Sequence, residues 1–127
     1  ATDFEHRSFG QELALCQRYF QKYVHIANTS CIGTGLIWSG TQVRTPFMFL
    51  KEMRSAPSFT SSTASTFQAS NGDQSRTASA LSLSSICKTH AIIIMTTSSG
   101  LTQSNPIFMD NANNGGTDSF FALDSEL

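Results

Sequence analysis

Carboxylate pairs are the first residues to weigh for catalysis, because glycoside hydrolysis needs two carboxyl groups flanking the scissile bond. Asp110 and Asp118 lie close together in the sequence and form such a pair. Both lie in or beside a loop rich in Asn and Gly, where Asp is common because its side chain makes turns. We therefore interpret both as turn residues. We predict a protein without catalytic residues, one that is not an enzyme.

Histidine and glycine do not occur at the spacings of a metal or nucleotide site. His6, His25 and His90 are scattered, and none of them is four residues from another, the spacing that places two metal ligands on one helix face. The G-T-G motif at residues 33–35 lacks the third glycine and the following helix of a dinucleotide fingerprint. The serine-rich chain also has no G-x-S-x-G nucleophile elbow. We therefore predict that the protein binds no metal and no cofactor.

The cysteines, Cys16, Cys31 and Cys87, are odd in number and show no C-x-x-C spacing. That pattern fits neither a disulfide framework nor a zinc site. Free cysteine is among the residue types most often found in protein interiors. We therefore predict three buried, free thiols.

Binding of a saccharide fits the residue types better than catalysis does. Hydroxyl and amide side chains hydrogen-bond sugar hydroxyl groups, and aromatic rings stack on sugar faces. The candidate ligand contacts are Asn111, Asn113 and Asn114, in the loop at residues 111–116, together with Trp38. The loop is the favoured contact region, because recognition residues are often carried on loops over a rigid scaffold. Trp38 follows two aliphatic residues, so we expect it in the core, with exposure as the alternative.

The composition excludes two classes of partner. Only 13% of the 127 residues are charged and the formal net charge is −1. Ser and Thr supply about a quarter of the chain, well above ordinary usage. Nucleic-acid binding needs clustered Lys and Arg, so we predict no nucleic-acid partner. No apolar run approaches the roughly 20 residues of a membrane-spanning helix, so we predict no membrane insertion.

One segment, residues 8–23, has the pattern of an α-helix. Ser8 and Gln11 match a capping box. Apolar residues then recur at alternating spacings of four and three, which places them on one stripe of a helix. The stripe consists of Phe9, Leu13, Cys16, Phe20 and Tyr23. Its heptad-like spacing makes it a candidate oligomer interface, and the alternative is that it covers one face of the chain's own β-structure.

The segment at residues 24–127 has the pattern of short β-strands. Residues 42–50 alternate between apolar and other side chains, with Pro46 at an edge, at a bulge or where pairing begins. The apolar run at residues 91–97 predicts a central strand buried on both faces, and the N-G-D motif at residues 71–73 predicts a hairpin turn. About eight strands separated by Gly, Asn and Pro turns predict an all-β fold. We expect an antiparallel, jelly-roll-like β-sandwich preceded by one N-terminal α-helix, with residues 1–23 as lead-in and helix of the same single domain.

Three stretches resemble a C-terminal module of structural proteins of tailed bacteriophages, especially tail fibres and other virion appendages. They are FEHRSFGQELALCQRYFQKY at residues 4–23, MRSAP at 53–57 and FALDSEL at 121–127. Together they span the chain in outline. The resemblance implies a virion structural protein on the surface of the phage particle, in contact with other virion proteins. It also implies that the chain is the C-terminal part of a longer one.

The resemblance further implies a homotrimer, with the helical stripe near the threefold axis and the β-domains packed around it. It implies host attachment, with the loops of the β-domain facing a glycan on the host surface. One alternative is a capsid decoration or cement domain of the head-fibre kind, which stabilises the virion and recognises nothing on the host. The third hypothesis is the carbohydrate-binding module of a polysaccharide-degrading enzyme.

Overall fold

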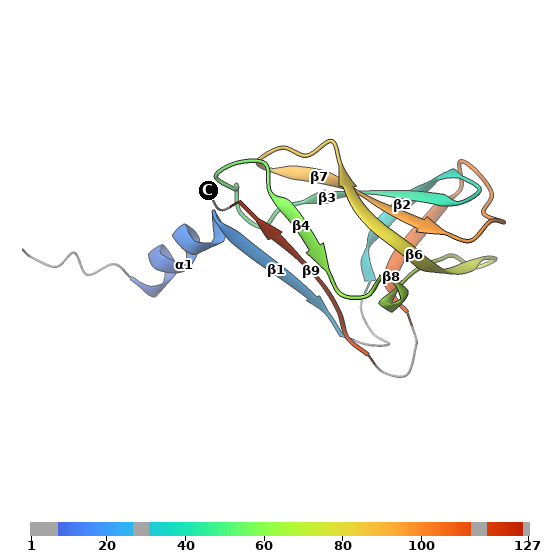
Figure 1. The fold of residues 1–127 in the computed structure, drawn as a ribbon, viewed down its shortest axis with the longest axis horizontal. Coiled ribbons are helices and arrows are strands. Elements are labelled where there is room, and N and C mark those ends of the chain that lie inside the picture. The colour runs from blue at the N-terminus through green and yellow to red at the C-terminus, as the bar shows by residue number, and fades with distance from the viewer. Residues whose placement is uncertain (1–7, 27–30, 113–116, 126–127) are drawn as a thin grey trace, which may run out of the picture.

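The computed structural model describes residues 8–26, 31–112 and 117–125, which form one α-helix, one 3-10 helix and nine strands (Figure 1). In chain order the elements are α1 (Phe9–Gln17), β1 (Phe20–His25), β2 (Cys31–Ser39), β3 (Gln42–Met48), β4 (Ser58–Ser61), η1 (Ala64–Thr66), β5 (Phe67–Ser70), β6 (Ser75–Ser84), β7 (His90–Thr97), β8 (Pro106–Asn111) and β9 (Ser119–Asp124). All strand pairs are antiparallel. The prediction of an antiparallel, mostly β chain with one α-helix at its start is confirmed.

Six of the strands close into a barrel in the order β2-β3-β7-β6-β5-β8. Strand β8 closes it by pairing with both β2 and β5. The turn between β5 and β6 is the predicted one, because the side-chain oxygen of Asn71 accepts hydrogen bonds from the backbone N–H groups of Asp73 and Gln74, at 3.0 and 2.8 Å. The predicted sandwich is not confirmed. Short alternating strands fit either architecture, and closure depends on which distant strands pair.

The other three strands form a separate sheet in the order β1-β9-β4, which lies beside the barrel in Figure 1. Phe121 of β9 is 1% exposed and belongs to the same core cluster as the barrel residues. Its ring centroid lies 5.0 Å from that of Tyr23 in β1 and 5.1 Å from that of Phe47 in β3. This aromatic cluster therefore joins the three-stranded sheet to the barrel.

Alternation along the strands decides which side chains enter the core. In β3, Val43 and Thr45 are buried whereas Met48 is exposed, as residues 42–50 predict. In β7, Ile93 is buried but its neighbour Ile92 is only half-buried. The predicted burial of both faces of β7 is therefore wrong for the outer face. The strand is nevertheless central, since it lies between β3 and β6.

Helix α1 begins as the sequence predicts. The Ser8 Oγ accepts a hydrogen bond from the Gln11 backbone N–H at 3.3 Å, and the Gln11 side chain accepts one from the Ser8 N–H at 3.0 Å. This reciprocal pair is the predicted capping box. Figure 1 shows α1 extending away from the strands at one end of the molecule.

The helix ends at residue 17, however, and not near residue 23. The carbonyl of Arg18 accepts hydrogen bonds from the Arg54 N–H at 2.7 Å and from the Ser125 hydroxyl at 2.8 Å, so the chain is held by other segments where it leaves the helix. Every residue of β1 is then paired with a residue of β9, from Phe20 with Asp124 onward. These tertiary contacts outweigh the helical propensity of residues 18–23.

Candidate functional site

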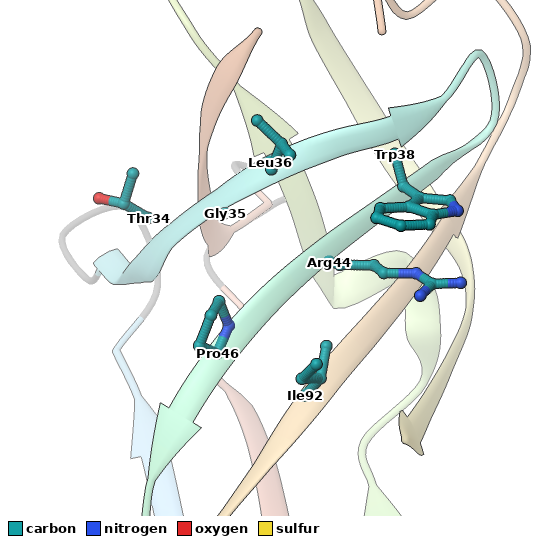
Figure 2. A pocket seen from close by; sticks show the side chains of 7 residues that line it. All are labelled: Thr34, Gly35, Leu36, Trp38, Arg44, Pro46 and Ile92. Atoms are coloured by element: carbon teal, nitrogen blue, oxygen red, sulfur yellow. The ribbon is translucent and has the colours of Figure 1, made fainter. Parts of the chain in front are cut away.

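An open groove crosses the outer face of the barrel over β2, β3 and β7 (Figure 2). Its volume is about 520 Å³. An aromatic and a cationic side chain lie next to each other at one end, and mainly aliphatic groups line the remainder. The lining residues are Thr34, Gly35, Leu36, Trp38, Arg44, Pro46 and Ile92.

Trp38 supplies the aromatic surface of the groove. It is 51% exposed, whereas its neighbour Ile37 in β2 is fully buried. Successive side chains of a strand point to opposite faces, so burial of Ile37 turns Trp38 outward. The expected core position of Trp38 is therefore wrong, and its place as a candidate ligand contact fits the exposure.

Arg44 of β3 covers one face of the Trp38 ring, with its guanidinium carbon 4.1 Å from the ring centroid. The Arg44 Nε also donates a hydrogen bond to the side-chain oxygen of Gln42 at 3.1 Å. A cation over an indole face is attracted by the ring quadrupole. The stack and the hydrogen bond together fix the orientation of Arg44 along the groove.

Gly35 lets β2 pass close to β3 beneath the groove. A Cβ atom at Gly35 would lie 2.7 Å from the carbonyl oxygen of Arg44, closer than real Cβ contacts. Pairing between β2 and β3 reaches only as far as Arg44. Pro46 lies beyond that point, in register with Ile92 of β7, so no β2 residue needs the N–H group that proline lacks.

The groove carries one positive charge and no negative charge among its lining residues. Arg44 is the only ionisable side chain in the lining. In the part of the chain that the structure describes, its two terminal nitrogens make no hydrogen bond, and no carboxylate pairs with it. A ligand in the groove therefore meets unused N–H donors beside an aromatic ring.

The structure does not bring the predicted asparagine contacts to the groove. Asn111 is 4% exposed, and its amide nitrogen donates hydrogen bonds to the carbonyls of His25 and Thr117 and to the Ser119 hydroxyl. Its side chain therefore ties the ends of β1, β8 and β9 together. Asn111 also follows the residue that pairs with Cys31, at the opposite end of β2 from Trp38. The predicted contacts Asn113 and Asn114 lie outside the described residues.

The predicted interface residues do not form one helical stripe. Phe9, Leu13 and Cys16 lie on α1 and are exposed, and no residue of α1 is buried. Phe20 and Tyr23 lie on β1, where Phe20 is 48% exposed and Tyr23 packs into the core. The alternative in which the whole stripe covers the chain's own β-structure is therefore wrong for α1.

The two carboxylates of the candidate pair have different surroundings. The Asp110 carboxylate accepts a hydrogen bond from the Ser70 hydroxyl at 2.8 Å, whereas Asp118 is exposed ahead of β9. Residues 8–26, 31–112 and 117–125 contain no group of three or more His, Cys, Asp or Glu side chains that could hold a metal ion. In the same residues no helix has the length and apolar character needed to cross a membrane.

The thiols are less buried than predicted. Cys16 and Cys31 are exposed and Cys87 is half-buried, and all three are free. The Cys87 sulfur lies 3.3 Å from the Thr89 hydroxyl and 3.2 Å from the His90 Nδ1. Hydrogen bonding, mainly with Thr89, lowers the pKa of the Cys87 thiol.

No family model, curated protein or solved structure matches this chain. The groove and the sequence resemblance are therefore the two observations that bear on function.

Sequence reasoning did not identify Arg44 as part of a site. The sequence contains only part of the signal. The alternation in residues 42–50 separates Arg44 from the buried Val43 and Thr45, and the short turn at Gly40 makes β2 and β3 a hairpin. Regular pairing across that turn would place Trp38 opposite the buried Val43, so Trp38 reaches the face of Arg44 only through the register shift between Ile37 and Ser39.

Proposed function

We propose that this chain is a non-enzymatic structural module of a tailed-phage virion, of the tail-fibre or appendage type, that binds a host-surface glycan in the groove over β2, β3 and β7. On this proposal the protein lies on the surface of the phage particle and contacts other virion proteins. Two observations support it: the resemblance of residues 4–23, 53–57 and 121–127 to phage modules, and the chemistry of the groove. Imaging of virions labelled with an antibody to this chain tests the location.

The half-exposed Trp38, held under Arg44, is the observation that carries the glycan proposal. The exposed part of the indole offers a rigid apolar surface to the C–H face of a sugar ring, so little side-chain entropy is lost on binding. The Thr34 hydroxyl and the Arg44 N–H groups line the same groove and can hydrogen-bond sugar hydroxyls. The volume of about 520 Å³ falls in the range of sites for small ligands.

Binding of the purified chain to an array of bacterial surface glycans tests this proposal. We expect the wild type to bind a subset of the glycans and Trp38→Ala to lose that binding. Phe120→Ala is the matched control, because Lys22 lies 4.4 Å over the Phe120 ring in a second cation–aromatic pair on the three-stranded sheet. The control should bind like the wild type. An absence of binding by the wild type, or full binding by Trp38→Ala, would reject the proposal.

We propose in addition that α1 joins copies of the chain into a homotrimer. The helix has nine residues and none is buried, with Phe9 82% exposed and Leu13 45% exposed. Isolated helices of this length are marginal in water, so packing against a partner would stabilise α1. Other copies of the chain are the proposed partner because Phe9, Leu13 and Cys16 keep the spacing by which identical helices seat knobs into holes.

The mass measured by light scattering tests this assembly. We expect a trimeric wild type and a dissociated Leu13→Glu, because identical charges would meet at the axis. Phe108→Glu is the control, since Phe108 is a 52% exposed residue on β8 of the barrel. It should remain trimeric. A wild type that is a monomer at high micromolar concentration would reject the trimer.

A capsid decoration or cement domain is the second candidate function. The observation that favours it is the exposure of several apolar side chains on α1 and β1, which suits attachment to other virion proteins. These are Phe9, Leu13, Leu15, Phe20 and Val24. Specific binding to purified capsids, together with no binding on the glycan array, would support this function over host attachment.

A further inference from the structure

We infer that the glycan recognised in the groove is acidic, and that Arg44 binds an oxyanion, a carboxylate or a phosphate, carried by a sugar that packs against Trp38. The inference rests on the glycan-binding function proposed above and specifies its ligand class. It follows from the hydrogen bonds and charge of the groove.

The guanidinium of Arg44 is only partly used within the protein. Its Nε is bonded to the Gln42 side chain at 3.1 Å, and one of its faces lies on Trp38. The two terminal nitrogens have no partner among the described residues. Guanidinium nitrogens form a planar fork that matches the two oxygens of a carboxylate or phosphate. Because Nε and one face are fixed, the fork is held in place before a ligand arrives.

The balance of charge selects an anion over a neutral sugar. No carboxylate is among the lining residues, so no opposite charge in the lining offsets that of Arg44, and the exposed part of its guanidinium needs water to solvate it. Any ligand that covers the groove removes part of that water, which is costly for an unpaired charge. A neutral sugar offers only hydroxyl groups in exchange. An acidic sugar supplies an opposite charge and two acceptor oxygens at the same place.

The apolar side chains position the rest of the sugar. Leu36 is 43% exposed, and with Pro46 and Ile92 it lines the part of the groove away from the guanidinium. A sugar ring has an apolar C–H face and a polar edge, so it can lie over these side chains while its oxyanion reaches Arg44. A second copy of this chain is the other occupant that such a surface could accept. If a second copy occupied the groove, Trp38→Ala would change the mass of the assembly.

Three probes test the inference by calorimetry on the full chain. They are an oligogalacturonide, its methyl ester, which has the same sugars without charge, and a phosphomannan fragment, which carries phosphate instead of carboxylate. We expect the wild type to bind at least one acidic probe roughly tenfold or more tightly than the methyl ester, as a charge-assisted hydrogen bond implies. Which acidic probe binds better distinguishes a carboxylate from a phosphate ligand. That preference should shrink at high salt.

Variants of Arg44 separate the contribution of its charge to affinity from the contribution of the apolar groove surface. Arg44→Met should remove the preference for the acidic probe, so that the acid and the methyl ester bind with equal affinity. Arg44→Lys keeps the charge without the fork, so it should lose several-fold in affinity for the acidic probe while retaining the fold. Arg76→Met, at an arginine on β6 outside the groove lining, should behave as the wild type.

The outcomes distinguish failure of the inference from failure of the glycan function. Equal affinity for the acid and the ester, with Trp38→Ala abolishing both, would overturn the acidic ligand and leave glycan binding standing. Binding of no probe and no arrayed glycan would overturn both. A changed mass of Trp38→Ala in light scattering would assign the groove to a second copy and overturn the inference.

Discussion

Tyr23 of β1 stacks on Phe121 of β9, and the two residues are direct partners in the strand pair. Their ring centroids are 5.0 Å apart with an interplanar angle of 24°. Phe47 of β3 meets both rings edge-on, at 4.9 Å from Tyr23 and 5.1 Å from Phe121. Phe121 therefore lies where the three-stranded sheet meets the barrel, and the attachment of β1 and α1 depends on it.

Phe121→Ala should lower the free energy of unfolding by about 3 to 5 kcal/mol, because it removes a fully buried ring and leaves a cavity. Phe120→Ala is the control, since Phe120 is the neighbouring residue on the opposite face and is only half-buried. We expect it to cost about 1 kcal/mol or less. Urea denaturation of the two variants measures the difference. Equal losses of unfolding free energy would show that Phe121 contributes no more than Phe120 to the packing of the three-stranded sheet on the barrel.

Gly35→Ala should destabilise the protein by about 1 to 3 kcal/mol, because its Cβ would meet the Arg44 carbonyl oxygen at 2.7 Å and force β2 away from β3. Gly40→Ala is the matched control, since the nearest atom to its Cβ is the Leu101 carbonyl oxygen at 3.7 Å. It should be near neutral. Thermal melts compare the two. A stable Gly35→Ala variant would contradict the close approach of the strands beneath the groove.

His25 should make stability fall as the solution becomes acidic. Its ring stacks on Phe121 at 5.6 Å, its buried Nε2 has no hydrogen-bond partner among the described residues, and burial lowers its pKa from the ordinary value of 6.5. The unfolded chain therefore takes up a proton near pH 6.5 that the folded chain resists, so stability is lost as the pH falls from 6.5 toward the lower pKa of the folded state.

Melting temperatures at pH 7.5 and pH 5.5 check this, with His25→Phe as the comparison. The variant keeps the ring and removes the titrating nitrogens, so its melting temperature should depend less on pH. An identical pH dependence in both proteins would exclude His25 as the cause.

Cys87 should be alkylated faster than its exposure alone predicts, because hydrogen bonding with Thr89 lowers its pKa and raises the fraction of thiolate at neutral pH. Thr89→Val should slow the reaction several-fold at pH 7.5. Mass spectrometry after brief treatment with iodoacetamide measures the rate at each cysteine. The rate at Cys31 in the same samples is the internal control and should not change. An unchanged rate at Cys87 in Thr89→Val would contradict the role of Thr89.

The start of α1 could be predicted from sequence, but its end could not. Ser8 and Gln11 are local signals, and they form the predicted capping box. Residues 18–23 follow the helical period, and apolar and polar residues do not alternate along them as in a half-buried strand. The choice is made by β9, from the far end of the chain, which pairs with β1 along its whole length. The sequence of residues 18–23 alone does not predict that pairing.

Closure of the barrel and assembly of the groove depend on distant contacts in the same way. Individual strands such as β3 could be predicted from their alternation. The pairing of β8 with both β2 and β5 could not, because nothing in the sequence of β8 specifies its partner strands. Trp38 follows aliphatic residues and therefore resembles a core residue. Its exposure follows from the burial of Ile37 in the closed barrel, and its contact with Arg44 depends on the register shift between Ile37 and Ser39.

Binding of a saccharide in the groove beside Trp38 can be followed by the fluorescence of that residue. Trp38 is the only tryptophan in the chain, so its emission reports on the groove alone. The wild type and Phe120→Ala are titrated with a glycan selected on the array, and calorimetry measures the affinity independently. We predict a saturable change in tryptophan emission whose midpoint equals the calorimetric dissociation constant in both proteins. Calorimetric binding without any change in the emission of Trp38 would place the glycan outside the groove and reject the proposed site.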